Sequence, residues 1–279
     1  MYTSLINKKT NIYYYLFVLL FFLGQMIFSQ ESVKFEHITT QNGLSQNDVN
    51  AIYQDNKGFL WFATHDGLNK YDGYSFTVYQ PNANDSLSIS SNLIFDIIGD
   101  KKGNLWVGTT GSGLNYFDQL TNSFKNYKHN EENNNSLIND YIIGMLLDSK
   151  NRLWIGTQKG LDMVDLEKRE TPLRFNHFTI EQSISIKSKA NNINAIYEDK
   201  TGEIWVGTLH GLFTMSRDKN GEYYMNLVPK EFGFPRTTVG SITEDKYGKL
   251  LIGSSNGLFV STDATKTKVE FVQRGFFND

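Results

Sequence analysis

Residues 193–212 read INAIYEDKTGEIWVGTLHGL, and stretches of the same pattern recur four more times along the chain. The other copies occupy residues 49–68, 94–114, 142–161 and 239–258. A tryptophan stands at the same place in four copies, namely Trp61, Trp106, Trp154 and Trp205, and Leu251 replaces it in the fifth. Repetition with a period of about 48 residues is typical of β-propellers, in which each repeat forms one small sheet, or blade.

Each copy reads as two strands joined by a tight turn. In the first copy, apolar and polar residues alternate over 49–54, and an apolar stretch follows at 59–64. In the turn, an aspartate can accept hydrogen bonds from the backbone, and a glycine that follows supplies a positive φ. In the third copy Asn151 replaces this glycine, and asparagine tolerates that conformation well. The turn aspartates are Asp55, Asp100, Asp148, Asp199 and Asp245.

The second strand of each copy is apolar on both faces, so both faces need cover, as when small sheets stack around an axis. We expect the tryptophan of one blade to pack over the glycine of its neighbour. The sequence therefore predicts an all-β fold, a β-propeller of four-stranded blades, over residues 31–279. The blades are expected to centre on residues 49–79, 94–127, 142–178, 193–228 and 239–272.

The number of blades bears on whether the ring is closed. Nothing after Val260 reads as a closing or capping segment, so we expect five blades in an incomplete, open propeller, from a truncated gene product. A closed ring of five blades, completed by residues 35–38, is the alternative.

The first thirty residues differ from the rest. Lys8 and Lys9 precede an apolar run over 12–28, and polar sequence resumes at Ser29. This layout predicts a signal peptide over residues 1–30 and an exported, periplasmic chain. An uncleaved membrane anchor is the alternative, because the run is near the minimum length for a spanning helix.

Composition excludes several classes of function. The chain has no cysteine, so disulfides, thiolate metal sites and a lipoprotein anchor are excluded. The net charge is −3, and basic and acidic residues are interspersed. The sequence therefore has no basic stretch of the kind that binds nucleic acid or an anionic membrane. We expect membrane contact only through the signal segment or through parts C-terminal to this chain.

No motif indicates catalysis, a metal or a cofactor. Each turn offers one aspartate, whereas calcium needs several converging oxygens. The order Asp, Gly, Trp is similar to the Asp-box of sialidases, but the interval from Asp55 to Trp61 is one residue too long. Paired carboxylates for glycoside hydrolysis need only converge in space, so that alternative stays open. Loop or surface roles are expected for the histidines, which are His37, His65, His129, His177 and His210.

The repeat resembles a known family. An apolar strand, Asp-x-x-Gly, apolar-Trp-apolar-Gly-Thr and Gly-Leu together are similar to the two-component regulator propeller repeat. The opening FEHITT at 35–40, with Gly43-Leu44-Ser45 and Asn50-Ala51-Ile52, resembles the start of the periplasmic sensor of hybrid two-component systems. The resemblance covers residues 35–260. It implies a sensor of oligosaccharides in which two propellers precede a β-sandwich, a membrane span and a histidine kinase, and no kinase segment is present in this sequence.

Binding is expected in the variable loops of one rim, where blade-joining loops meet the turns between second and third strands. The blade-joining segments 82–92, 128–140 and 182–192 are rich in asparagine and serine, which suit sugar hydroxyls. An ordinary loop role is the alternative for any one of them. The predicted ligand-binding residues are His65, Asp66, Thr110, Ser112, Gln158, Lys159, His210 and Asn256.

Three classes of function remain. The first is a sensor module that binds an oligosaccharide, the remaining sensor domains or a dimer partner. The second is an exported carbohydrate-active enzyme on a propeller scaffold, and a protein-interaction propeller is a weaker third.

Overall fold

The computed structural model describes residues 17, 35–168, 172–180 and 191–272. The chain divides into two compact units, Met1–Ile38 and Thr39–Asp279, and every named strand lies in the second. The predicted signal peptide over residues 1–30 lies outside the described residues except for Phe17, as does most of the segment 182–192. Within the described ranges, no helix is long and apolar enough to cross a membrane.

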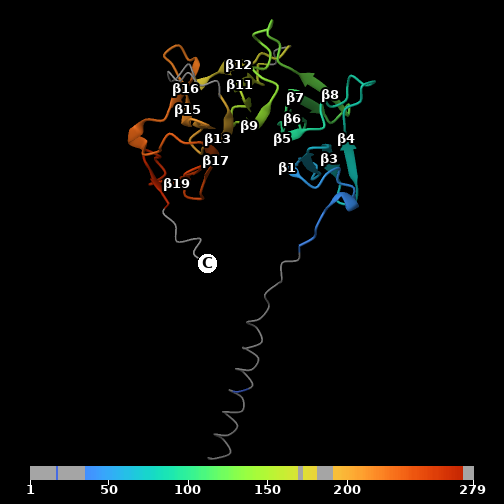
Figure 1. The fold of residues 1–279 in the computed structure, drawn as a ribbon, viewed down its shortest axis with the longest axis horizontal. Helices are drawn as coiled ribbons and strands as arrows, with labels where there is room; N and C mark the ends of the chain where they lie inside the picture. Colours follow the sequence, from blue (N-terminus) through green and yellow to red (C-terminus); the bar gives the residue numbers. More distant parts are fainter. Residues whose placement is uncertain (1–16, 18–34, 169–171, 181–190, 273–279) are drawn as a thin grey trace, which may run out of the picture. The chain divides into compact units, whose positions relative to one another are not determined.

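The described residues form five four-stranded antiparallel sheets, in which consecutive strands pair in chain order (Figure 1). The predicted all-β class is confirmed. Blade 1 consists of β1 (Val49–Gln54), β2 (Leu60–Thr64), β3 (Gly67–Tyr71) and β4 (Phe76–Tyr79). Blade 2 consists of β5 (Ile94–Gly99), β6 (Leu105–Thr109), β7 (Leu114–Asp118) and β8 (Ser123–Tyr127). Blade 3 consists of β9 (Ile142–Leu147), β10 (Arg152–Thr157), β11 (Gly160–Asp165) and β12 (Asn176–Phe178).

Blade 4 consists of β13 (Ile193–Glu198), β14 (Ile204–Thr208), β15 (Gly211–Arg217) and β16 (Tyr223–Leu227). Blade 5 consists of β17 (Val239–Glu244), β18 (Leu250–Ser254), β19 (Gly257–Ser261) and β20 (Val269–Phe271). Two short 3-10 helices, η1 (Thr40–Asn42) and η3 (Lys230–Phe232), precede blades 1 and 5 respectively.

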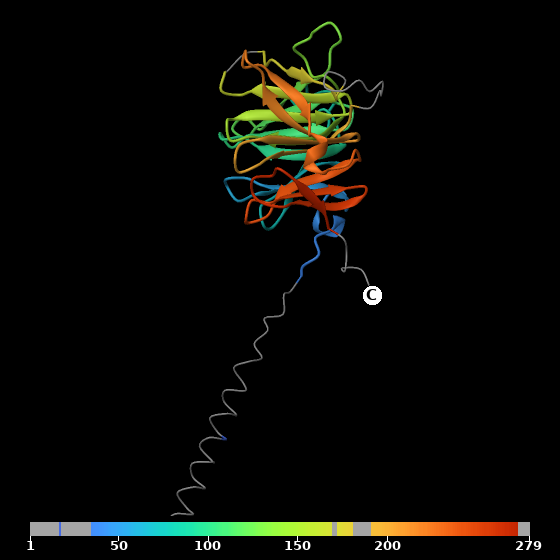
Figure 2. The same cartoon turned by 90° about the vertical axis from the view of Figure 1, so that its left-hand side faces the viewer.

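Neighbouring blades pack through their first strands. β1 packs against β5, β5 against β9, β9 against β13, and β13 against β17. Figure 1 shows the blades following one another along an arc, and Figure 2 shows the sheets as stacked layers. Among the described residues, no packing of this kind joins β1 to β17. The expected open arrangement is therefore the one observed, and the closed ring of five is not.

The hydrophobic core lies between the blades, and at three of the interfaces a branched aliphatic residue packs directly against a glycine of the preceding blade. A Cβ atom added to Gly156 would lie 2.9 Å from Ile193, and one added to Gly207 would lie 2.5 Å from Val239. Ile193 and Val239 are the first residues of β13 and β17. The expectation that a tryptophan covers the neighbouring glycine is therefore wrong. A short branched side chain covers it, because only such a side chain lets the next first strand approach closely.

The turn between the first and second strands forms as predicted. Asp55 Oδ1 accepts hydrogen bonds from the backbone N–H groups of Lys57 and Phe59, at 2.9 and 3.0 Å. The other four turn aspartates make the same pair of bonds. The φ angle is 88° at Gly58 and 59° at Asn151, so the predicted positive φ is confirmed in both.

The second carboxylate oxygen of the turn aspartate has a role that sequence analysis did not predict. In blades 1, 3 and 4, the tryptophan indole N–H donates to Oδ2 of the turn aspartate in its own blade. The distances are 2.9 Å for Trp61 to Asp55, 2.8 Å for Trp154 to Asp148 and 2.8 Å for Trp205 to Asp199. The constant spacing of aspartate and tryptophan in the repeat is thus the spacing of a buried hydrogen bond.

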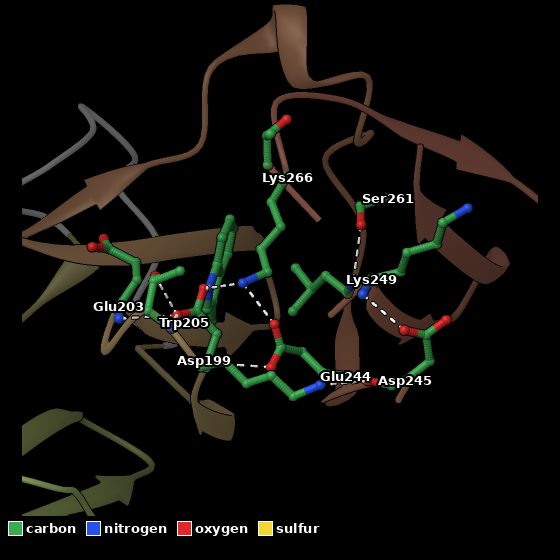
Figure 3. A network of polar contacts seen from close by, with 12 residues as sticks. Asp199, Glu203, Trp205, Glu244, Asp245, Lys249, Ser261 and Lys266 are labelled. Atoms are coloured by element: carbon green, nitrogen blue, oxygen red, sulfur yellow. Dashed lines mark hydrogen bonds and ion pairs between the residues drawn. The ribbon is translucent and has the colours of Figure 1, made fainter. Parts of the chain in front are cut away.

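We call the region where a turn aspartate meets the following blade a junction. In the junction between blades 4 and 5, Lys266 comes from the segment between β19 and β20, and its Nζ lies 2.7 Å from Asp199 Oδ2 (Figure 3). The same Nζ lies 2.6 Å from Glu244 of β17. All three side chains are almost fully buried. A buried ammonium group between two carboxylates therefore joins the last two blades.

The ammonium group of Lys266 affects the pKa of Asp199. Burial alone would raise the pKa of Asp199, but hydrogen bonds from Lys266, Thr201 and Trp205 outweigh it and lower the pKa to about 2. Burial likewise tends to lower the pKa of Lys266, but its two carboxylate partners raise it above the usual value. Both groups are therefore charged at neutral pH.

Candidate functional site

The rim is the edge of the propeller that carries the turns between second and third strands. In each blade a hydroxyl group closes this turn by donating to a glycine carbonyl. Thr64 donates to Gly67 at 2.8 Å and Thr109 to Gly113 at 2.7 Å. The remaining three blades use Thr157, Thr208 and Ser254 in the same way. The backbone of each rim turn is thus fixed independently of the side chains that the turn presents.

The loops that lead into blades 1, 2 and 3 are fastened to the rim by polar residues that were not predicted from the sequence. Asn69 and Asn115 are fully buried on the third strands, and their Oδ1 atoms accept from Ser45 N–H and Ser90 N–H, each at 2.9 Å. Buried Asp162 accepts from Ile138 N–H at 2.8 Å. The signal in the sequence is a polar residue directly after Gly-Leu in three repeats, at a position where strands otherwise carry apolar residues.

The structure places all eight predicted ligand-binding residues on rim turns, with two on each of blades 1, 2 and 3 and one on each of blades 4 and 5. Four of them are exposed, namely His65, Gln158, Lys159 and Asn256. The other four are half-buried, namely Asp66, Thr110, Ser112 and His210. They share an edge, but they belong to five different turns, so their role in binding stays a prediction.

Two of the half-buried residues hold neighbouring loops. The Asp66 carboxylate accepts hydrogen bonds from Gln80 Nε2 at 3.0 Å and Asn92 Nδ2 at 3.3 Å, and both partners belong to the segment that leads to blade 2. The carbonyl oxygen of Ser112 accepts from the hydroxyl of Ser90 at 3.0 Å. These contacts give Asp66 and Ser112 a structural role whatever the rim binds.

A pocket of about 540 Å³ opens on the rim beside His210. Its walls include Gly211 of the blade 4 turn and Phe234 of the loop that joins blades 4 and 5, together with Lys230 and Arg236. The two basic side chains belong to exposed residues, and Phe234 packs edge-on against Phe259 at 4.9 Å between ring centroids. The pocket therefore combines an apolar wall with positive charge.

One histidine departs from the expected loop or surface role. His177 lies in β12, where its Nδ1 is 2.6 Å from Oδ1 of the buried Asp162. The hydrogen bond to Asp162 raises the pKa of His177 above its usual value, although burial opposes it. This pair was not predictable from the sequence, because the two residues come together only through the pairing of β11 with β12.

One further carboxyl group is perturbed near the inner strands. Burial raises the pKa of Asp96, on β5, to about 6. Its two oxygens accept from the backbone N–H groups of Met145 and Ile97, at 2.7 and 2.8 Å. Because Met145 lies on β9, Asp96 joins blades 2 and 3, and this structural role explains its buried position and its raised pKa. In the described part of the chain, no group of three or more histidine, aspartate or glutamate side chains could hold a metal ion.

Comparisons with known proteins agree with this architecture. The family model described as two component regulator propeller matches residues 43–66, 88–111, 136–159 and 187–210. Among curated proteins, histidine kinase P4 of Formosa agariphila is 44% identical over 81 residues, which are 29% of this chain and 6% of that protein.

Among solved structures, the extracellular domain of the hybrid two component system BT3049 from B. thetaiotaomicron is similar, with 26% identity and a TM-score of 0.55. The match covers 87% of this chain and 37% of that one. The extracellular domain of BT4673 from the same organism shares the fold, with 22% identity, a TM-score of 0.64 and 83% and 30% coverage. This chain thus spans a minor part of each relative. The family match thus identifies two-component regulator propeller repeats in blades 1 to 4, and the solved structures share the blade architecture described above.

Proposed function

We propose that this chain is the ligand-sensing propeller region of an extracytoplasmic two-component sensor, that it lies in the periplasm, and that it recognises a glycan-derived ligand. The observation that carries the sensor assignment is the similarity over 87% of the chain to the extracellular domain of a hybrid two-component system. Kinase activity would reside in other regions of such a system, and the propeller would supply recognition.

The rim supports the assignment to ligand binding. Its turns are held by hydroxyl-to-carbonyl bonds, so their exposed side chains can vary without loss of the fold. Those side chains include amides, an imidazole and an ammonium group, which can donate to and accept from sugar hydroxyls. The pocket beside His210 adds an apolar wall of the kind that the carbon face of a sugar ring contacts.

We expect the chain to bind its ligand without changing it. The turn aspartates, which are the most regular carboxylates of the sequence, are engaged in backbone hydrogen bonds, and this suits a structural role. The alternative of a carbohydrate-active enzyme would instead need two free carboxyl groups on either side of a bound glycosidic bond.

The proposal is tested with the full chain on an array of oligosaccharides, followed by mass analysis of a bound sugar after long incubation. We expect binding to a group of related oligosaccharides and recovery of the sugar intact. The double variant Gln158→Ala, Lys159→Ala should weaken binding, because both side chains are exposed on a rim turn. Lys57→Ala, in a turn between first and second strands, is the matched control and should bind normally.

Two results would contradict the proposal, and a third would narrow its site. Binding to no oligosaccharide, with capture of a protein domain instead, would favour the protein-interaction alternative. Release of shortened sugars would show an enzyme. Equal binding by the rim double variant and the control would remove the blade 3 rim turn from the site.

A further inference from the structure

Three of the four junctions between blades are filled by a side chain that binds the turn aspartate, and one is not. In the first junction, Gln119 of blade 2 donates to Asp55 Oδ2 at 3.1 Å, beside the Trp61 indole. In the last, Lys266 of blade 5 fills the equivalent place on Asp199. Each of these turn aspartates therefore accepts a hydrogen bond from the tryptophan of its own blade and another from a side chain of the following blade.

The third junction is filled from within its own blade. Arg152 Nε lies 2.5 Å from Asp148 Oδ2, and the guanidinium group of Arg152 stacks on Tyr223 of blade 4 at 4.8 Å. A pocket lies against this junction, but its lining includes Arg152 and Tyr223 and not Asp148, among the described residues. Arg152 thus fills the place beside the Asp148 carboxylate, and the third junction is not open.

The second junction, between blades 2 and 3, lacks both partners. Among the residues that the structure describes, the buried indole N–H of Trp106 has no hydrogen-bond partner. Asp100 Oδ2 has only a long contact, 3.4 Å, with the Tyr116 hydroxyl. The residue of blade 3 that aligns with Gln119 is Leu166, whose side chain cannot donate a hydrogen bond.

A pocket of about 610 Å³ occupies the place that the other junctions fill. Trp106, Asp100, Tyr116 and Tyr127 line it from blade 2, and Asn151 and Leu166 line it from blade 3. The Tyr116 and Tyr127 rings lie 4.6 and 6.0 Å from the Trp106 ring, between centroids. Three aromatic rings thus gather at one wall of this pocket.

Two buried polar atoms of the lining residues are unpaired, and they are of opposite kinds. Trp106 Nε1 is a donor, and Asn151 Oδ1 is an acceptor that also lacks a partner within the described residues. Leaving such groups unpaired in a buried place is costly, so a ligand that supplies partners gains affinity. Burial and the charge of Asp100 raise the pKa of Tyr116 to about 12, so its phenol stays neutral; its hydroxyl accepts from Asn104 Nδ2 at 2.6 Å and makes the long contact with Asp100.

We infer that the pocket at the second junction binds a sugar ring. A hydroxyl group both donates and accepts, so adjacent hydroxyls on one ring can satisfy the indole N–H and the asparagine oxygen together. The carbon–hydrogen face of the same ring matches the aromatic wall. The Asp100 carboxylate can accept from a further hydroxyl.

This inference rests on the proposed function only in the class of ligand. The site itself is different: the second junction lies at the turns between first and second strands, and the rim lies at the opposite ends of those second strands. A single second strand, β6, connects the two: it begins at Leu105, near Asp100, and ends at Thr109 on the rim. A sugar at the second junction would therefore occupy a site separate from the rim turns.

The test follows the indole N–H signals of the four tryptophans by nitrogen–proton NMR of the full chain. Glucose, galactose, mannose, xylose and glucuronate are added separately, up to about 50 mM, enough to detect a millimolar dissociation constant. The Trp106 signal is assigned as the one that Trp106→Phe removes. We expect at least one sugar to shift the Trp106 signal saturably and to leave those of Trp61 and Trp154 in place.

Two variants keep the test independent of folding defects. Leu166→Gln places in the second junction the side chain that fills the first, and it should abolish the shift. Asn151→Gly restores the glycine found in the other four repeats and suits the φ of 59°, so it should fold normally and weaken binding by about fivefold. The inference is overturned if no sugar shifts the Trp106 signal, if all indole signals shift alike, or if Leu166→Gln binds like the unaltered chain.

The rim double variant Gln158→Ala, Lys159→Ala separates this inference from the proposed function. If the second junction binds sugar, this variant keeps the Trp106 response unchanged. If oligosaccharides bind the chain through the rim while Trp106 stays silent, the inference fails and the proposed function stands. If Trp106 responds and the rim variant binds oligosaccharides normally, the inference stands and the blade 3 rim turn is excluded from the site.

Discussion

The second and fourth junctions are built from the same repeat, but one is open and the other is filled. Between blades 4 and 5, Lys266 places a buried ammonium group on Asp199. Between blades 2 and 3, Asp100 and the Trp106 indole face a pocket. The difference shows that the turn aspartate and tryptophan are a constant framework, and that the presence or absence of a side chain bound to the aspartate decides whether the junction stabilises the fold or leaves room for a ligand.

The largest expected effect comes from emptying the filled junction. Lys266→Met leaves Asp199 and Glu244 buried without their cation, and breaking a buried ion pair in this way costs about 3 kcal/mol of unfolding free energy. Urea unfolding measures the loss. Lys268→Met, at an exposed position nearby, is the matched control and should change little. A loss no larger than that of the control would mean that Lys266 does not hold blades 4 and 5 together.

The filled junction should also give the chain a characteristic response to acid. The folded pKa of Asp199 is about 2, below its usual value, so its contribution to stability is fully present above about pH 4 and is lost as the pH falls through 2. A shift of this size corresponds to about 2 kcal/mol. Unfolding measured between pH 4 and pH 2 should show this loss in the unaltered chain and not in Asp199→Asn. Parallel curves for the two proteins would refute the assignment.

A smaller and reciprocal effect is expected from exchanging the residues of the first and second junctions. Gln119→Leu removes a hydrogen bond to Asp55 and should lower the unfolding free energy by about 1 kcal/mol. Leu166→Gln gives Asp100 such a partner and should raise it by a similar amount. Thermal and urea unfolding of both variants check the signs. Destabilisation by both would show that the second junction is not an unfilled version of the first.

The repeat made most of the architecture predictable from the sequence. The positions of the turn aspartates and of Asn151 follow from local backbone chemistry, and local chemistry is readable in one sequence. The sealing of Gly207 by Val239 was not predictable, because it depends on how closely two blades approach. The junction contacts were missed for the same reason: Gln119 and Asp55 are far apart in the chain and meet only when the blades stack.

The predicted rim residues illustrate a further limit. The sequence located the rim turns, since these are fixed by a threonine or serine and a glycine. It did not reveal that the Asp66 carboxylate fastens the loop to blade 2, nor that His177 pairs with Asp162. The only sign in the sequence of the candidate pocket at the second junction is Leu166 at the position where blade 2 has Gln119. That difference can be interpreted only once the stacking of the blades is known.

The central claim, that the second junction lacks the partners that fill the others, is tested most directly by hydrogen exchange of the indole N–H groups in the ligand-free chain. Trp61, Trp154 and Trp205 donate to buried aspartates, whereas Trp106 has no partner among the described residues. We predict that the Trp106 indole exchanges with solvent deuterium faster than the other three. Protection of Trp106 equal to that of the other three would contradict the account.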